Sequence, residues 1–135
     1  MANAVYWKPV SGERLREDQI AVNNPLKHLP LTQQRDRLPI SKHRNDLLYA
    51  IERHDVVVLV GETGSGKSTQ LPIYLHEAGW LTDEKRSSNR GIIICEPRKL
   101  AAISLASRVA EEMGVVLGEE VGYAVRYRIH IIYIL

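Results

Sequence analysis

The pattern of apolar and polar positions predicts alternating helices and strands along most of the chain. A first helix is expected from Ser41, a suitable N-cap, because long or apolar side chains then recur every three to four residues on one face. That face comprises Arg44, Leu47, Leu48 and Ile51. Residues 56–60 are five consecutive aliphatic residues, which is typical of a strand buried on both faces of a parallel sheet.

The same alternation continues after residue 60. A second helix is expected over residues 66–78, with Pro72 inside it and Gly79 after its last turn. Residues 92–95 are expected to form a second buried strand, and a third helix should follow over residues 100–113 and end at Gly114. The inward face of this third helix would carry Leu100, Ile103, Ala106, Val109, Ala110 and Met113. The order of strands and helices predicts an α/β fold with a parallel sheet and flanking helices.

Composition limits the classes of protein that fit this pattern. The 135 residues suffice for one domain, and residues 1–37, with three prolines and no sustained period, are expected to form an irregular extension. The formal net charge of +2 is too small to indicate a nucleic-acid partner by itself. The single cysteine, Cys95, favours a reducing compartment, and neither a secretory signal nor a membrane-spanning apolar run is expected.

Residues 61–68, with the sequence GETGSGKS, match the phosphate-binding pattern G-x-x-x-x-G-K-[ST]. The glycines allow successive backbone N–H groups to face one anion at the start of a helix, where the helix dipole also favours negative charge. Lys67 is expected to contact the β- and γ-phosphates, and the Ser68 hydroxyl to bind Mg²⁺. The predicted strand before the motif and helix after it are the context that such a site requires, so we predict nucleoside-triphosphate binding.

A carboxylate that holds magnesium and orients the attacking water is not evident after the motif. Asp83 and Glu84 lie in a polar segment that resembles a loop. Glu111 and Glu112 are expected on the solvated face of the third helix. The hydrolytic half of an NTPase site is therefore expected to be missing from these residues.

Several segments resemble the DEAH-box RNA helicases, most closely the spliceosome-associated members. Residues 61–72, GETGSGKSTQLP, are similar to the nucleotide-binding motif of that family, and residues 95–102, CEPRKLAA, are similar to its second motif. Residues 107–114 and 117–127 also resemble family sequence, so the resemblance covers about residues 35–127. It implies an incomplete first RecA-like domain at residues 38–127, with the P-loop NTPase fold of a parallel sheet and flanking helices.

The resemblance also implies roles for individual residues. Arg108 corresponds to an arginine whose guanidinium stacks on adenine, and Arg98 and Lys99 fall at positions that contact the RNA backbone. For Arg98 and Lys99 a solvated helix start is the alternative. The residues expected to hold ATP and Mg²⁺ are Gly61, Glu62, Thr63, Gly64, Ser65, Gly66, Lys67, Ser68 and Thr69, with Lys67 and Ser68 as the catalytic residues and Ser68 as the metal ligand. RNA, spliceosomal proteins and a nuclear localisation are implied in the same way.

Two departures from the family pattern affect these expectations. Glu96 follows Cys95 where the family usually has Thr-Gln, and its negative charge would approach the RNA phosphates. Residues 128–135 form an atypical apolar tail where the family continues toward an Asp-Glu-Ala-His motif. We interpret this tail as the product of an alternative or mispredicted exon or of a shifted frame. As an exposed apolar strand it would favour aggregation.

We therefore expect the ATP-binding part of a helicase that couples ATP hydrolysis to RNA unwinding in pre-mRNA splicing. Little activity is expected from these residues alone, because the DEAH motif and the second RecA-like domain are absent from them. A small P-loop kinase is one alternative, and it would need an acceptor pocket and a lid with arginines after the third helix. A non-catalytic truncated isoform that binds nucleotide or a partner protein is the other alternative.

Overall fold

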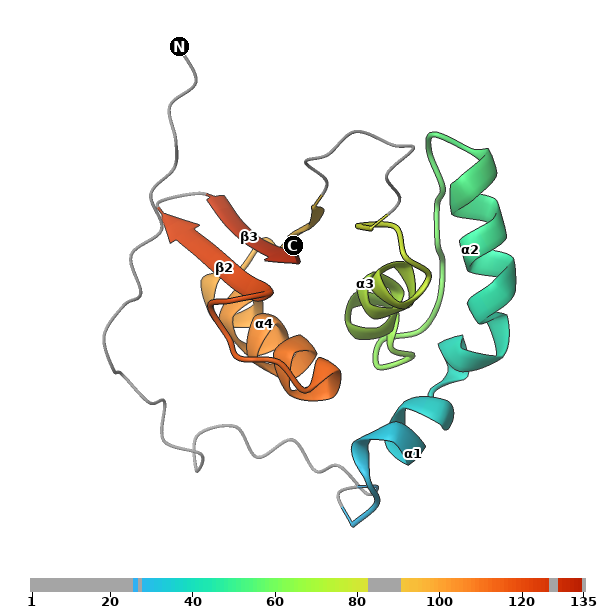
Figure 1. Ribbon diagram of the computed structural model, residues 1–135, viewed down its shortest axis with the longest axis horizontal. Coiled ribbons are helices and arrows are strands. Elements are labelled where there is room, and N and C mark those ends of the chain that lie inside the picture. Colours follow the sequence, from blue (N-terminus) through green and yellow to red (C-terminus); the bar gives the residue numbers. More distant parts are fainter. Residues whose placement is uncertain (1–25, 27, 83–90, 127–128, 135) are drawn as a thin grey trace.

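The computed structural model describes residues 26, 28–82, 91–126 and 129–134 (Figure 1). In chain order the elements are α1 (Leu31–Asp36), the 3-10 helix η2 (Pro39–His43), α2 (Arg44–Arg53), α3 (Lys67–Glu77), β1 (Ile92–Cys95), α4 (Lys99–Met113), β2 (Val121–Arg126) and β3 (Ile129–Ile134). None of these helices is long and apolar enough to cross a membrane.

Three helices lie where the hydrophobic pattern predicts them. In α2 the predicted face is confirmed, because Leu47 is buried and Leu48 and Ile51 are half-buried. α3 continues through the buried Pro72, and α3 and α4 are followed by Gly79 and Gly114 at φ values of +77° and +71°, as expected for glycines that end helices. α4 buries the central part of its predicted inward face, whereas Leu100, in its first turn, is exposed.

The segment before α2 differs from the expectation. Ser41 does not cap α2, because its hydroxyl donates to the carbonyls of Asp36 (2.7 Å) and Leu38 (2.8 Å) inside the preceding turns. The first turn is instead wound as η2, and α2 begins at Arg44. Within the extension predicted to be irregular, residues 31–36 form α1, while residues 1–25 and 27 lie outside the described part of the chain.

The three strands form an antiparallel sheet in the order β1–β3–β2. Ile134 of β3 lies opposite Ile92 of β1 on one side and Val121 of β2 on the other. The described residues therefore do not form the parallel sheet predicted from the sequence, and the helix that packs against β2 and β3 is α4. The apolar tail explains this difference: Ile132 and Ile134 become fully buried when β3 lies between the other two strands. Ile132 and Ile134 are thus not exposed, whereas the sequence predicts an exposed tail.

Residues 56–60 are not the buried strand that their composition predicts. They belong to neither a helix nor a strand, among the described residues no strand pairs with them, and all four valines are exposed. Only Leu59 packs inward, against a cluster formed by η2, α2 and α3. The second predicted strand, β1, does form, but Ile93 on its outer face is 64% exposed. Burial of a strand on both faces depends on neighbours that only the tertiary fold supplies.

The phosphate-loop helix α3 lies between α2 and α4 (Figure 1). On one side Ile73 joins a core formed by α4 and the sheet, whose other fully buried members are Ala102, Ala106, Val109, Val121, Ile132 and Ile134. On the other side Tyr74 packs with Ile40 and Leu47. Because α3 is packed on both sides, the position of the helix that follows the loop is fixed.

Replacing Val58 with Lys should change the free energy of unfolding by less than about 0.5 kcal/mol, because this side chain is 82% exposed. The neighbouring Leu59→Lys should destabilise the protein by about 1–3 kcal/mol, because Leu59 packs against the cluster on α2 and α3. Urea unfolding of both variants, followed by circular dichroism, measures the difference. A large loss in the Val58 variant would show that residues 56–60 are buried in a sheet after all.

Candidate functional site

Residues 61–66 connect residues 56–60 to α3. At two of these positions the backbone adopts a conformation that favours glycine. Gly64 and Gly66 have φ values of +82° and +93°, which L side chains rarely adopt. A Cβ on Gly66 would also lie 2.9 Å from Leu38 Cδ1 and 3.1 Å from Ile40 Cγ2. The N–H of Ile40 donates to the carbonyl of Ser65 (3.2 Å), so η2 supports the loop from behind.

Lys67, the first residue of α3, folds its side chain back across the loop. Its Nζ donates to the carbonyl oxygens of Gly61 and Glu62, both at 2.7 Å, and lies 3.2 Å from Ser65 Oγ. The Ser65 hydroxyl in turn donates to the Glu62 carbonyl (2.8 Å). The ammonium is therefore centred on the loop at the N-terminus of α3, where the helix dipole also favours an anion.

The next two residues face different environments. Ser68 is exposed in the first turn of α3, where its hydroxyl is a hard oxygen of the kind that Mg²⁺ binds. Thr69 donates its hydroxyl to the Gly66 carbonyl (3.2 Å), so it braces the loop from inside the helix. In the described part of the chain no group of three His, Cys, Asp or Glu side chains could hold a metal ion. Magnesium binding by Ser68 thus remains a prediction from the motif.

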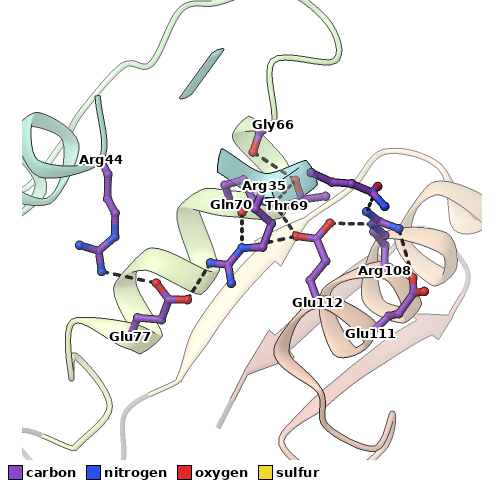
Figure 2. Close-up of polar contacts among 10 residues, drawn as sticks. Arg35, Arg44, Gly66, Thr69, Gln70, Glu77, Arg108, Glu111 and Glu112 are labelled. Carbon is purple, nitrogen blue, oxygen red and sulfur yellow. Dashed lines mark hydrogen bonds and ion pairs between the residues drawn. The ribbon is translucent and has the colours of Figure 1, made fainter. Parts of the chain in front are cut away.

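A polar network, which we call the Gln70–Glu112 network, links the start of α3 to α1 and α4 (Figure 2). Gln70, fully buried, donates from Nε2 to Thr69 Oγ1 (3.1 Å) and to Glu112 Oε2 (2.5 Å). Its Oε1 accepts a hydrogen bond from Arg35 Nε (2.9 Å). Arg108 Nε donates to the other Glu112 oxygen, Oε1, at 2.6 Å. The network therefore joins the phosphate loop, through Thr69, to the arginine on α4.

The expectation of a solvated face is wrong for Glu112, whose side chain is 3% exposed, and it holds for Glu111, which is 60% exposed. A buried carboxylate requires hydrogen-bond and charge partners, and Gln70, Arg108 and Arg35 supply them. Sequence reasoning did not assign a role to Gln70, Glu112 or Arg35. The available signal was the i, i+4 spacing of Arg108 and Glu112 on one helix.

A second group of polar contacts holds the C-terminal end of α3. Glu77 accepts from Arg35 NH2 (2.6 Å) and from Arg44 NH2 (3.4 Å), so it bridges α1 and α2. The Arg44 guanidinium lies 5.4 Å from the centre of the Tyr74 ring. Burial raises the pKa of Tyr74, with the Arg35 charge acting in the opposite direction, so this phenol is neutral at physiological pH. These contacts hold α3 in position without involving the loop itself.

The structure brings some of the predicted site residues together and leaves others apart. Residues 61–69 form one loop and helix start, and Arg108 is connected to them through Gln70 and Glu112. Arg98 and Lys99 are exposed where β1 leads into α4. Their role in binding RNA stays a prediction, as does the stacking role of Arg108.

Curated proteins with similar sequences are RNA helicases. The chain is 46% identical over 134 residues to probable ATP-dependent RNA helicase DHX35 of Homo sapiens, an alignment that covers 90% of this chain and 18% of the human protein. It is 51% identical over 112 residues to the Caenorhabditis elegans DHX35 homolog, covering 82% and 15%. It is 42% identical over 120 residues to probable ATP-dependent RNA helicase DHR2 of Saccharomyces cerevisiae, covering 87% and 16%. No family model matches the chain.

The chain spans 15–18% of the length of these relatives, while the alignments cover 82–90% of the chain itself. The chain is therefore similar to one segment of the DEAH-box ATP-dependent RNA helicases, which confirms the resemblance that its motifs predict.

Proposed function

We propose that residues 61–69 bind the phosphates of Mg²⁺-bound ATP and that the chain supplies the ATP-binding part of an RNA helicase. The observation that carries this proposal is the placement of Lys67 Nζ across the loop, 2.7 Å from two loop carbonyls, at the N-terminus of α3. An ammonium in this position can exchange its carbonyl partners for phosphate oxygens, which are stronger acceptors because they are charged. The names of the relatives support ATP as the nucleotide.

The residues present fit magnesium and ATP in the first turn of α3. Gly64 and Gly66 adopt the positive φ values that allow loop N–H groups to face an anion, and Ser68 is exposed at the helix start, where its hydroxyl can reach a magnesium ion. Bound magnesium would neutralise phosphate charge. In this assignment the chain's own residues bind and orient the triphosphate, while Arg108 stacks on the base.

The contacts with RNA and the role in the cell are proposed from the resemblance to longer helicases. We propose that Arg98 and Lys99 contact the RNA backbone, since both are exposed at the carboxyl end of β1. The RecA-like parallel sheet, the role in splicing, the spliceosomal partners and the nuclear localisation follow from the resemblance alone and form part of this proposal. Little ATP hydrolysis and no unwinding are expected of these 135 residues, which do not contain the Asp-Glu-Ala-His motif. The relatives favour a helicase over a small kinase.

Replacing Lys67 with Ala should lower the affinity for Mg²⁺–ATP by at least about tenfold, because it removes a charge-assisted contact to the phosphates. Isothermal titration calorimetry on the full chain measures this change. Lys99→Ala is the matched control, since Lys99 is likewise the first residue of a helix but lies outside the loop, and it should leave ATP affinity unchanged. The proposal fails if the unmodified chain shows no heat with Mg²⁺–ATP, or if both variants bind ATP equally.

A further inference from the structure

We infer that Glu112 and Gln70 are positioning residues: they hold the Arg108 guanidinium in one orientation for a nucleobase and connect it to the phosphate loop. This inference rests on the proposed function, because it requires that residues 61–69 bind a nucleotide. It goes further by giving roles to two buried residues that lie outside the phosphate-loop motif. It also specifies that their effect concerns the base and not the phosphates.

The first step of the argument is the burial of Glu112. A carboxylate that is 3% exposed has lost nearly all its water and must be compensated by the protein. Each oxygen accepts one short hydrogen bond: Oε2 from Gln70 (2.5 Å) and Oε1 from Arg108 (2.6 Å). Arg35 Nε adds a positive charge 4.0 Å from Oε2. The position of this carboxylate is therefore fixed from two helices, α1 and α3, besides its own.

The second step concerns the plane of the Arg108 guanidinium. Its Nε donates to Glu112, its NH1 to Glu111 (3.2 Å) and its NH2 to Gln34 (3.4 Å). Guanidinium N–H bonds lie in the plane of the group, so three partners around its edge set the orientation of that plane. The flat faces need no hydrogen-bond partner and are the surfaces that stack on aromatic rings. The side chain is 34% exposed, so a planar ligand can reach it.

The third step is the connection to the phosphate loop. Thr69 Oγ1 donates to the Gly66 carbonyl, and Gln70 Nε2 contacts both Thr69 Oγ1 and Glu112 (Figure 2). A continuous series of hydrogen bonds thus runs from the left-handed glycine of the loop to the arginine on α4. Because Gln70 is fully buried, its amide cannot turn toward water when one partner is lost. The distance between the phosphate and base contacts is set by this series.

The test compares two ligands, Mg²⁺–ATP and Mg²⁺–tripolyphosphate, which share the phosphates and differ in the nucleoside. Glu112→Gln keeps the shape of the side chain but removes the charge that Arg108 faces. We expect it to weaken ATP binding by about three- to tenfold and to leave tripolyphosphate binding within about twofold. Glu120→Gln is the control, since Glu120 is exposed and lies outside the Gln70–Glu112 network, and removing its charge should change neither affinity.

A double-mutant cycle identifies Arg108 as the group through which Glu112 acts. Arg108→Ala should produce a loss for ATP at least as large as that of Glu112→Gln, and the two changes together should be no worse than Arg108→Ala alone. The exchanged pair Gln70→Glu with Glu112→Gln keeps the net charge and an amide–carboxylate contact between α3 and α4. This pair serves as a second test in case the single variant misfolds. It should lower the affinity for Mg²⁺–ATP by as much as Glu112→Gln does.

The possible results separate this inference from the proposed function. Equal losses for both ligands would mean that Glu112 is merely structural, and additive losses with Arg108→Ala would mean that it acts through another group; either result overturns the inference. Unchanged ATP affinity in the Glu112 variant and the exchanged pair also overturns it. If the unmodified chain binds neither ligand, or if Lys67→Ala has no effect, the proposed function fails and the inference fails with it.

Discussion

Replacing Ile132 with Ala is expected to lower the free energy of unfolding by about 3–5 kcal/mol, a large part of the stability of a small domain. Ile132 is fully buried in the middle of β3, opposite Ile94 of β1 and Tyr123 of β2. Its side chain belongs to the core formed with Val109 of α4 and Ile73 of α3. Truncation removes apolar contacts and leaves a cavity that the sheet can only partly close.

Urea unfolding followed by circular dichroism measures this loss. Ile93→Ala in β1 is the matched control, because it deletes the same atoms from a strand position that is 64% exposed, and it should change stability by less than about 1 kcal/mol. If the Ile132 variant is as stable as the Ile93 variant, residues 129–134 are not the central strand of the sheet. The result therefore also tests the strand order.

Replacing Gly66 with Ala is expected to lower the free energy of unfolding by about 2–4 kcal/mol, through backbone strain and through overpacking. The strain arises because φ is +93° at this position. The overpacking arises because the new Cβ would lie 2.9 Å from Leu38 Cδ1 and 3.1 Å from Ile40 Cγ2. Both effects move the loop away from η2, so the affinity for Mg²⁺–ATP should fall as well.

Gly64→Ala separates the two contributions. Gly64 also has a positive φ, +82°, but a Cβ there would meet no atom within 4 Å. We expect this control to destabilise the protein by about 1–2 kcal/mol, from strain alone. Thermal unfolding and ATP titration of both variants provide the comparison. If Gly66→Ala proves no more harmful than Gly64→Ala, the packing of the loop against η2 contributes nothing to its conformation.

The helices and the phosphate loop could be predicted because their causes are local. The i, i+3, i+4, i+7 pattern of Arg44, Leu47, Leu48 and Ile51 depends on the geometry of one helix, and α2 forms where it predicts. The glycines of residues 61–66 are required by the backbone of the loop itself, and Lys67 follows them directly. The same locality explains why the motifs identified the helicase family.

The sheet and the polar network could not be predicted in the same way. Residues 56–60 have the composition of a buried strand, yet strand formation needs a hydrogen-bonding neighbour, and in the described part of the chain none pairs with them. Glu112 was expected in solvent because carboxylates are mostly exposed. Its burial depends on Gln70 and Arg35, which lie 42 and 77 residues away in the sequence. Periodicity along α4 carries no information about such partners.

By itself the sequence determined the helix positions, the glycine-rich loop with its lysine, and the family, because each follows from residues within a few positions of one another. Only the tertiary structure decided that β3 lies between β1 and β2, and that Glu112 is buried beside Gln70 and Arg108. The physical reason is the same in both cases. Hydrogen bonds between strands and the compensation of a buried charge join segments far apart in the chain, and their free energy depends on which distant groups meet.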